Sequence, residues 1–121
     1  MVHLYQPDQE YPMPVRFFKS ETGREPVREW LRSLPDAEKL FIGVDIKTVQ
    51  FGWPLGMPLV RGLSPGIWEV RTKLENRVSR VLFTVFENQI ILLHGFIKKI
   101  QKTPKDDLNL AIRRLKQIRS G

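Results

Sequence analysis

Three apolar segments in the second half of the chain are joined by very short connections, which restricts the chain to folds that contain an antiparallel sheet. In residues 67–74, apolar side chains alternate with charged ones, as expected for a strand with one buried face. The segments 77–86 and 89–98 follow Glu75-Asn76 and Glu87-Asn88, and each of these pairs suits a two-residue hairpin turn. The sequence therefore predicts a meander of three antiparallel strands.

Helical periodicity locates two helices before this meander. In residues 25–34, apolar side chains recur at helical spacing, and Pro26 suits the first turn of a helix that starts near Glu25. A second helix is expected between Pro35 and Gly52, because glycine favours a helix end. One face of that helix carries an apolar stripe formed by Leu40, Phe41, Val44, Thr48 and Phe51.

The remaining segments complete an α+β domain. Residues 14–20 are expected to form a short strand, and residues 52–66 are rich in glycine and proline, which predicts a long loop. Residues 105–118 should form a third helix, with Asp106 and Asp107 placed favourably in its first turn. The order β-α-α-β-β-β-α indicates an antiparallel meander packed against two N-terminal helices and a C-terminal helix, the α+β class.

The composition narrows the classes of protein. The chain has 121 residues, enough for one domain, and we expect residues 1–13 to form a flexible tail and residues 14–121 the domain. It contains no cysteine and only two histidines, so we expect neither disulfides nor a metal or other cofactor. The N-terminus does not resemble a signal peptide, and no apolar run approaches about 20 residues, which predicts a cytoplasmic protein without a membrane span.

Positive charge is concentrated in the second half of the chain. Residues 1–60 hold 7 Lys and Arg against 8 Asp and Glu, whereas residues 61–121 hold 13 against 5. A basic half on a small domain favours nucleic acid or an acidic protein as the partner. A charge that serves only solubility is the simpler alternative.

Pairing the strands across their turns predicts a positively charged face. If Glu75-Asn76 is a two-residue turn, Arg71 lies directly opposite Arg80. Directly opposed like charges destabilise a sheet, so an anion between the two guanidinium groups would explain the pair. Surface ion pairs with Glu69 and Glu75 are the alternative explanation.

The second turn extends this face to the last strand. With a two-residue turn, Arg80 lies opposite Gly95, which leaves an open floor beside the guanidinium group. The same pairing turns His94 toward the core. A bulge at Gly95 would shift the register by one residue and exchange the faces of Lys98 and Lys99.

Several short motifs in these segments are shared with a known family. They are 68-WEVR-71, Arg80 followed by VLF, 94-HGFIKK-99 and 102-KTP-104, together with GREPVREWL and GWPLGMPLVRGL earlier in the chain. In these motifs the chain resembles the HigB-like branch of the RelE/ParE toxin superfamily, a group also known as phage-derived proteins. The resemblance covers about residues 14–118. It implies a RelE-like fold, a small sheet with two helices on one face.

The resemblance also implies the function of a type II toxin. RelE-like members are ribosome-dependent endoribonucleases that cut mRNA without a metal ion. The 2′-hydroxyl attacks the adjacent phosphate and leaves a 2′,3′-cyclic phosphate. The implied partners are mRNA on the ribosome and a helix-turn-helix antitoxin similar to HigA, encoded beside the toxin.

The resemblance assigns roles to the basic residues. By correspondence, Arg71 and Arg80 hold the phosphate, and Lys98 and Lys99 supply further cations, one of which protonates the leaving oxygen. The flanking residues expected to bind RNA are Lys73, Arg77, His94 and Lys102. Many RelE-like sites use a tyrosine near the C-terminus, but the only tyrosines here, Tyr5 and Tyr11, lie in the tail. The general base is therefore open among Glu69, His94 and a lysine.

Two other functions stay open. ParE-like members inhibit DNA gyrase and cut nothing, and a domesticated phage protein would bind RNA or an antitoxin without catalysis. The arginines on the strands favour cleavage, whereas the absence of a C-terminal tyrosine favours the non-catalytic protein.

Overall fold

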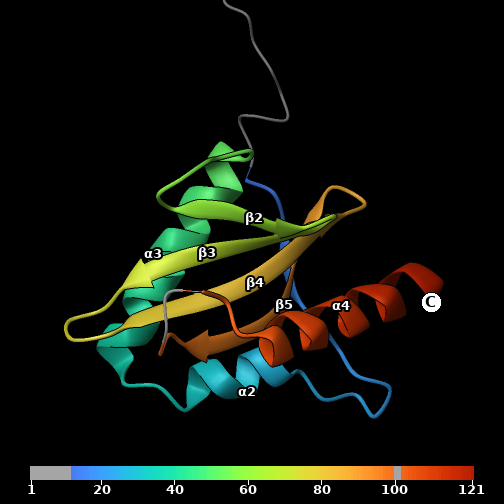
Figure 1. Ribbon diagram of the computed structural model, residues 1–121, viewed down its shortest axis with the longest axis horizontal. Helices are drawn as coiled ribbons and strands as arrows, with labels where there is room; N and C mark the ends of the chain where they lie inside the picture. Colours follow the sequence, from blue (N-terminus) through green and yellow to red (C-terminus); the bar gives the residue numbers. More distant parts are fainter. Residues whose placement is uncertain (1–11, 100–101) are drawn as a thin grey trace, which may run out of the picture.

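A computed structural model describes residues 12–99 and 102–121, and in this part of the chain three helices lie against one five-stranded sheet (Figure 1). The helices are α2 (Pro26–Arg32), α3 (Asp36–Gly52) and α4 (Lys105–Ser120). The strands are β1 (Val15–Phe17), β2 (Val60–Ser64), β3 (Ile67–Lys73), β4 (Val78–Phe86) and β5 (Gln89–Ile97). These bounds confirm the predicted α+β class. None of the described helices is both long and apolar enough to cross a bilayer.

The sheet has the strand order β1-β5-β4-β3-β2 and is mixed. The meander β3-β4-β5 is antiparallel as predicted, but β1 joins its edge in parallel with β5, with Val15 opposite Ile90. Just before β1, Met13 donates its backbone N–H to the carbonyl of Gln50 in α3. Of the predicted N-terminal tail, residues 1–11 lie outside the described residues.

The predicted loop over residues 52–66 was wrong in one part, because β2 lies inside it. Val60 pairs with Val70 and Gly62 with Trp68, and the register shifts between Gly62 and Ser64. The strand is only five residues long and contains a glycine at its centre, so neither alternation nor β-propensity marks it in the sequence. The strand forms because it pairs with β3, which lies outside the segment 52–66.

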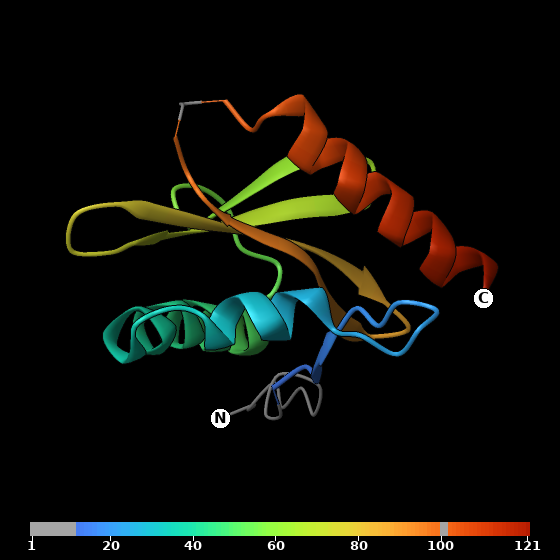
Figure 2. The same ribbon diagram turned by 90° about the horizontal axis from the view of Figure 1, so that it is seen from below.

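The helices cover the two faces of the sheet unequally. Figure 2 shows α2 and α3 on one side of the sheet and α4 on the other. The α2–α3 side holds the larger apolar cluster, which includes Val27, Ile42, Val81 and Phe83. On the other side a smaller cluster forms beneath Ala111 and Leu115 of α4. Because α4 covers only part of this face of the sheet, charged residues of the strands can be accommodated beside the N-terminal end of α4.

The apolar stripe identified on α3 is not its buried face. The buried side chains of α3 are Ile42, Ile46 and Val49, spaced by four and three residues. By contrast, Phe41 and Val44 are 47% and 54% exposed. Both stripes satisfy helical periodicity, so the period alone does not tell which one faces the sheet. The narrower row of β-branched side chains lies on the sheet and leaves the bulkier row in solvent.

The first hairpin has the predicted register and the second does not. Arg71 lies opposite Arg80, as expected. The second turn is also confirmed, because Glu87 and Asn88 both have positive φ, the conformation that tight hairpins require. Beyond it, however, a bulge interrupts the pairing between Phe83 and Leu82 of β4.

This bulge corrects three expectations about β5. Leu93 is the extra residue, so His94 lies opposite Leu82, and Phe96, not Gly95, lies opposite Arg80. Gly95 therefore provides no floor beside Arg80. A Cβ atom added to Gly95 would come within 2.4 Å of the Trp30 ring, so its lack of a side chain serves packing against α2. His94 moves from the core face to the α4 face.

Candidate functional site

Basic side chains of β3, β4 and β5 meet on the α4 face of the sheet, beside the start of α4. Arg71 and Arg80 are directly opposed on β3 and β4, as the sequence predicted. Lys98 follows the end of β5, where its backbone N–H donates to the carbonyl of Val78 over 2.7 Å. Arg61 of β2 also lies within electrostatic range of Arg80. We call Arg61, Arg71, Arg80 and Lys98 the cationic cluster.

A carboxylate of the protein itself compensates part of this charge. The Arg80 side chain is only 1% exposed and its Nη1 lies 3.3 Å from Oε2 of Glu69, which is fully buried. The hydroxyl of Thr103 donates to the same Glu69 oxygen over 2.7 Å and accepts from Arg80 Nη1 over 3.0 Å. Glu69 therefore compensates the charge of Arg80, one of the two opposed arginines. The surface ion pairs considered from the sequence do not describe Arg80.

This buried triad links the sheet to the start of α4. Thr103 precedes Pro104, the N-cap residue of that helix, so its bonds to Glu69 and Arg80 fix the start of α4 over the site. Two atoms at the centre, Glu69 Oε1 and Arg71 Nε, are buried without a hydrogen-bond partner among the described residues. A buried polar atom without a partner costs free energy, so an anion that accepted a hydrogen bond from Arg71 Nε would be stabilised here.

The electrostatics of the cluster lower the pKa of two cations. Burial lowers the pKa of Lys98, and the neighbouring charges of Arg71 and Arg80 lower it further. Burial also lowers the pKa of Arg80, with Glu69 opposing the shift and Arg71 and Arg61 adding to it. The cluster holds four positive groups around one carboxylate, and it therefore favours an added anion.

The other predicted site residues are distributed more widely. Lys99 and Lys102 are exposed on either side of the two residues outside the described part, and Lys73 is exposed at the end of β3. Arg77 does not face the cluster, because its guanidinium group forms an ion pair of 2.6 Å with Glu38 of α3. It holds the β3–β4 turn to α3.

The His94 side chain is held by contacts with other residues of the chain. Its Nε2 lies 2.6 Å from Oδ1 of Asp107 in the first turn of α4, and its ring stacks on Phe96. Further along α4, Arg114 donates to the carbonyl of Leu93 over 2.7 Å. These contacts hold α4 against the bulged part of β5. His94 is thus on the site face, but its contacts are those of an anchor for α4.

Three contributors to the site were not predicted. Arg61 was assigned to a loop, because β2 was missed. Thr103 gave only one signal, its position directly before the Pro104 that starts a helix. Asp107 was noted for its place in the first turn of α4, but its bond to His94 depends on the bulge at Leu93.

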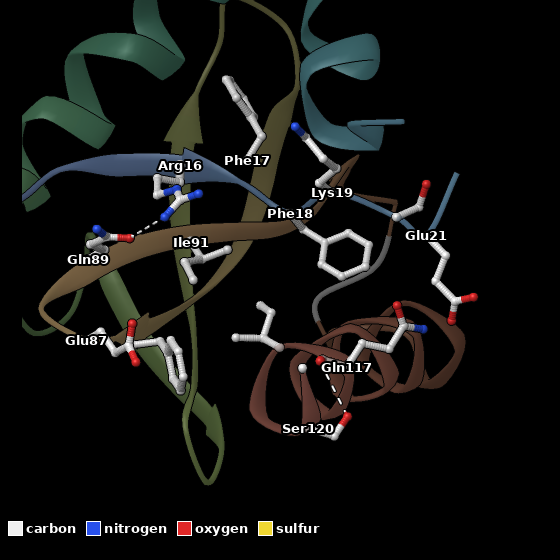
Figure 3. Close-up of a pocket in the computed structure, with 14 residues that line it drawn as sticks. Arg16, Phe17, Phe18, Lys19, Glu21, Glu87, Gln89, Ile91, Gln117 and Ser120 are labelled. Atoms are coloured by element: carbon white, nitrogen blue, oxygen red, sulfur yellow. Dashed lines mark hydrogen bonds between the residues drawn. The ribbon is translucent and has the colours of Figure 1, made fainter. Parts of the chain in front are cut away.

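A separate hollow of about 480 Å³ lies at the other end of α4 (Figure 3). Arg16, which donates to Gln89 over 3.1 Å, lines it on the strand side, and Gln117 and Ser120 line it from α4. About 15 residues of helix, or roughly 22 Å, separate this end of α4 from Thr103. The hollow therefore contributes nothing to the cationic cluster. In the described part of the chain, no group of three or more His, Cys, Asp or Glu side chains is placed to hold a metal ion.

Comparison with known proteins gives one family. The family model described as phage-derived protein Gp49-like (DUF891) matches residues 29–116, nearly three quarters of the chain. The matched segment runs from α2 to α4 and contains every member of the cationic cluster and of the buried triad. No curated protein matches the sequence.

Proposed function

Because the chain belongs to the Gp49-like family of phage-derived proteins, a family associated with RelE- and HigB-type toxins, we propose that it is the toxin of a type II toxin–antitoxin pair. In this proposal it is a ribosome-dependent mRNA endoribonuclease. Its partners are mRNA on the ribosome and a helix-turn-helix antitoxin encoded by the adjacent gene. The activity belongs in the cytoplasm, where ribosomes translate.

The observation that supports cleavage is the arrangement of Arg71 and Lys98 beside a buried Arg80. Arg71 and Lys98 are partly exposed, whereas Arg80 is buried and held by Glu69. A scissile phosphate bound here would meet Arg71 and Lys98 directly, with Arg80 adding a fixed positive charge. Preoriented cations stabilise the negative charge that builds on the phosphate in the transition state.

The proposed reaction needs no group beyond the RNA, water and these side chains. The 2′-hydroxyl gives its proton to water as the 2′-oxygen forms a bond to phosphorus, and the bond from phosphorus to the 5′-oxygen breaks, which gives a 2′,3′-cyclic phosphate and a 5′-hydroxyl. Lys98 donates a proton to the leaving 5′-oxygen, and its lowered pKa suits this role. Glu69, already bonded to Thr103 and Arg80, orients Arg80 and is not assigned as the base.

Induced expression in a bacterial host tests the proposal. We expect the wild-type chain to stop growth and to leave mRNA cut within translated codons, while Arg71→Ala does neither. Equal toxicity of the Arg71→Ala chain would exclude the proposed role of the cluster. Inhibited supercoiling with intact mRNA would instead indicate a gyrase inhibitor. Binding to programmed ribosomes without cleavage would identify a non-catalytic RNA-binding protein.

A further inference from the structure

A second surface, on the opposite side of the sheet from the start of α4, is strongly apolar. It lies on α3 and the segment that follows, and its members are all large side chains that are about half exposed or more. They are Leu40 at 65%, Phe41 at 47%, Val44 at 54%, Phe51 at 51% and Met57 at 70%. Single exposed apolar residues are ordinary, but several on one helix face mark a binding surface.

The packing of α3 against the sheet does not use this stripe. The helix already buries Ile42, Ile46 and Val49 against the sheet, so the exposed stripe is a second apolar face on the same helix. From Leu40 to Phe51 it spans 11 residues, which corresponds to roughly 16 Å of helix. That length accepts about three turns of another helix, packed ridge into groove.

The stripe borders two hollows that side chains of a partner can fill. One, of about 680 Å³, lies between α3 and the sheet edge and is lined by Phe41, Val44, Leu59 and Val78 among others. The second, of about 480 Å³, extends along α3 past Phe51. Val44 lines both, so the two hollows adjoin along the helix. We call the stripe and these two hollows the α3 groove.

The charges around the α3 groove indicate which kind of partner fits. Lys47 lines one hollow, and Lys73 and Arg71 line the other, with Asp45 as the acidic residue of the two linings. A symmetric pair of copies would bring the same cations together, on a chain that already carries a net charge of +7. An acidic segment would instead meet charges of the opposite sign.

We propose that the α3 groove binds an acidic amphipathic helix of another protein, with the apolar face of that helix on Phe41, Val44 and Phe51. This rests on the proposed function for the choice of the adjacent gene's product as the partner, but it does not depend on RNA cleavage. Because Arg71 lines one end of the groove, an acid at that end of the bound helix also reduces the positive charge offered to RNA.

Co-expression with the product of the adjacent gene tests this proposal. The variant is Phe41→Asp/Phe51→Asp in the full chain, and the matched control is Asn109→Asp/Gln117→Asp, which adds the same charge at exposed positions of α4. We expect the groove variant to bind at least roughly 30-fold more weakly, as for loss of a binding hot spot, and the control to bind like the wild type. Because the substituted positions are exposed, both variants should keep the wild-type melting temperature.

Two further measurements complete the test. Lys47→Glu should weaken binding, and in the wild-type complex hydrogen exchange should slow in residues 40–58. Equal binding by the groove variant, no complex at all, or protection confined to other segments would overturn the proposal.

Evidence for a different occupant of the groove would also overturn the proposal. A dimer of the isolated chain that the groove variant dissociates would identify a second copy of the chain. Protection that is lost on removal of residues 1–11 would identify the chain's own N-terminus. A groove variant that no longer binds the partner but still cuts mRNA would show that the groove serves partner binding and not cleavage.

Discussion

Arg80 is the residue on which the cationic cluster depends most, although it is almost wholly buried. Its charge is tolerated because Glu69 and Thr103 bind its guanidinium group, and its position on β4 places a positive charge directly opposite the partly exposed Arg71. A buried ion pair contributes little net stability but is costly to break from one side. The pair is therefore better explained by the electrostatic field it maintains than by stability.

Removing only Arg80 should destabilise the fold. We expect Arg80→Met to lower the free energy of unfolding by about 3–5 kcal/mol, because Glu69 is left charged and buried without its partner. Chemical denaturation measures this loss. The double variant Glu69→Leu/Arg80→Met should recover most of the stability but none of the nuclease activity. A stable Arg80→Met protein would show that Glu69 does not need this arginine.

Lys98 gives the proposed activity a pH dependence. A proton donor must be protonated, and the pKa of Lys98 is lowered from 10.5 by burial and by Arg71 and Arg80. We therefore expect cleavage to decline as the pH rises through this lowered pKa. Lys98→Arg, whose guanidinium group stays protonated, should shift or abolish that decline. An identical alkaline limb in the Lys98→Arg enzyme would remove Lys98 from the role of proton donor.

At the scale of elements, the bulge in β5 decides which side chains reach the site. It lies between the confirmed Glu87-Asn88 turn and the lysines that follow the strand, and it consists of a single extra residue, Leu93. Alternation in LLHGFIK is too weak to locate such an insertion, because apolar residues occupy both faces of a strand buried on both sides. The first hairpin was predictable because charged residues occur at every second position of β3, from Glu69 to Lys73, and the two-residue turn fixes the pairing with β4.

Gly95 tests this register. We expect Gly95→Ala to reduce the free energy of unfolding by about 1–3 kcal/mol, since the added methyl group meets the Trp30 ring at 2.4 Å. Gly62→Ala is the matched control, because its methyl group would find only ordinary contact with Trp68 at 3.7 Å. If the two variants melt alike, Gly95 does not face α2.

The link between α3 and the first hairpin should respond to acid. The hydrogen bond and charge of Arg77 hold the pKa of Glu38 below its ordinary value of 4.5. Its stabilising contribution is then present above pH 4.5 and is lost as the pH falls through the lowered folded-state pKa. Arg77→Ala should remove this part of the pH dependence of stability. Superimposable stability curves of the two proteins from neutral pH down to the acid transition would contradict the link.

At the scale of the whole molecule, two proposed binding surfaces lie on opposite sides of one sheet. The cationic cluster lies beside the start of α4, and the α3 groove lies on the other helical layer, with Arg71 between them. Apart from β2, the order of elements followed from periodicity and turns, and so did the class of fold. The orientation of α3 did not, because both of its stripes are apolar and the choice is made by the sheet. The burial of Arg80 also depends on Glu69 and Thr103, which only the folded chain brings together.

The most direct test of the central claim is the chemistry of the cut on ribosomes programmed with a defined mRNA. Purified wild-type chain should cut the message within codons in the decoding site and leave a 2′,3′-cyclic phosphate and a 5′-hydroxyl. Arg71→Ala, with an unchanged melting temperature, should leave the message intact. Intact mRNA with the wild-type chain, or cleavage that persists in Arg71→Ala, would contradict the account.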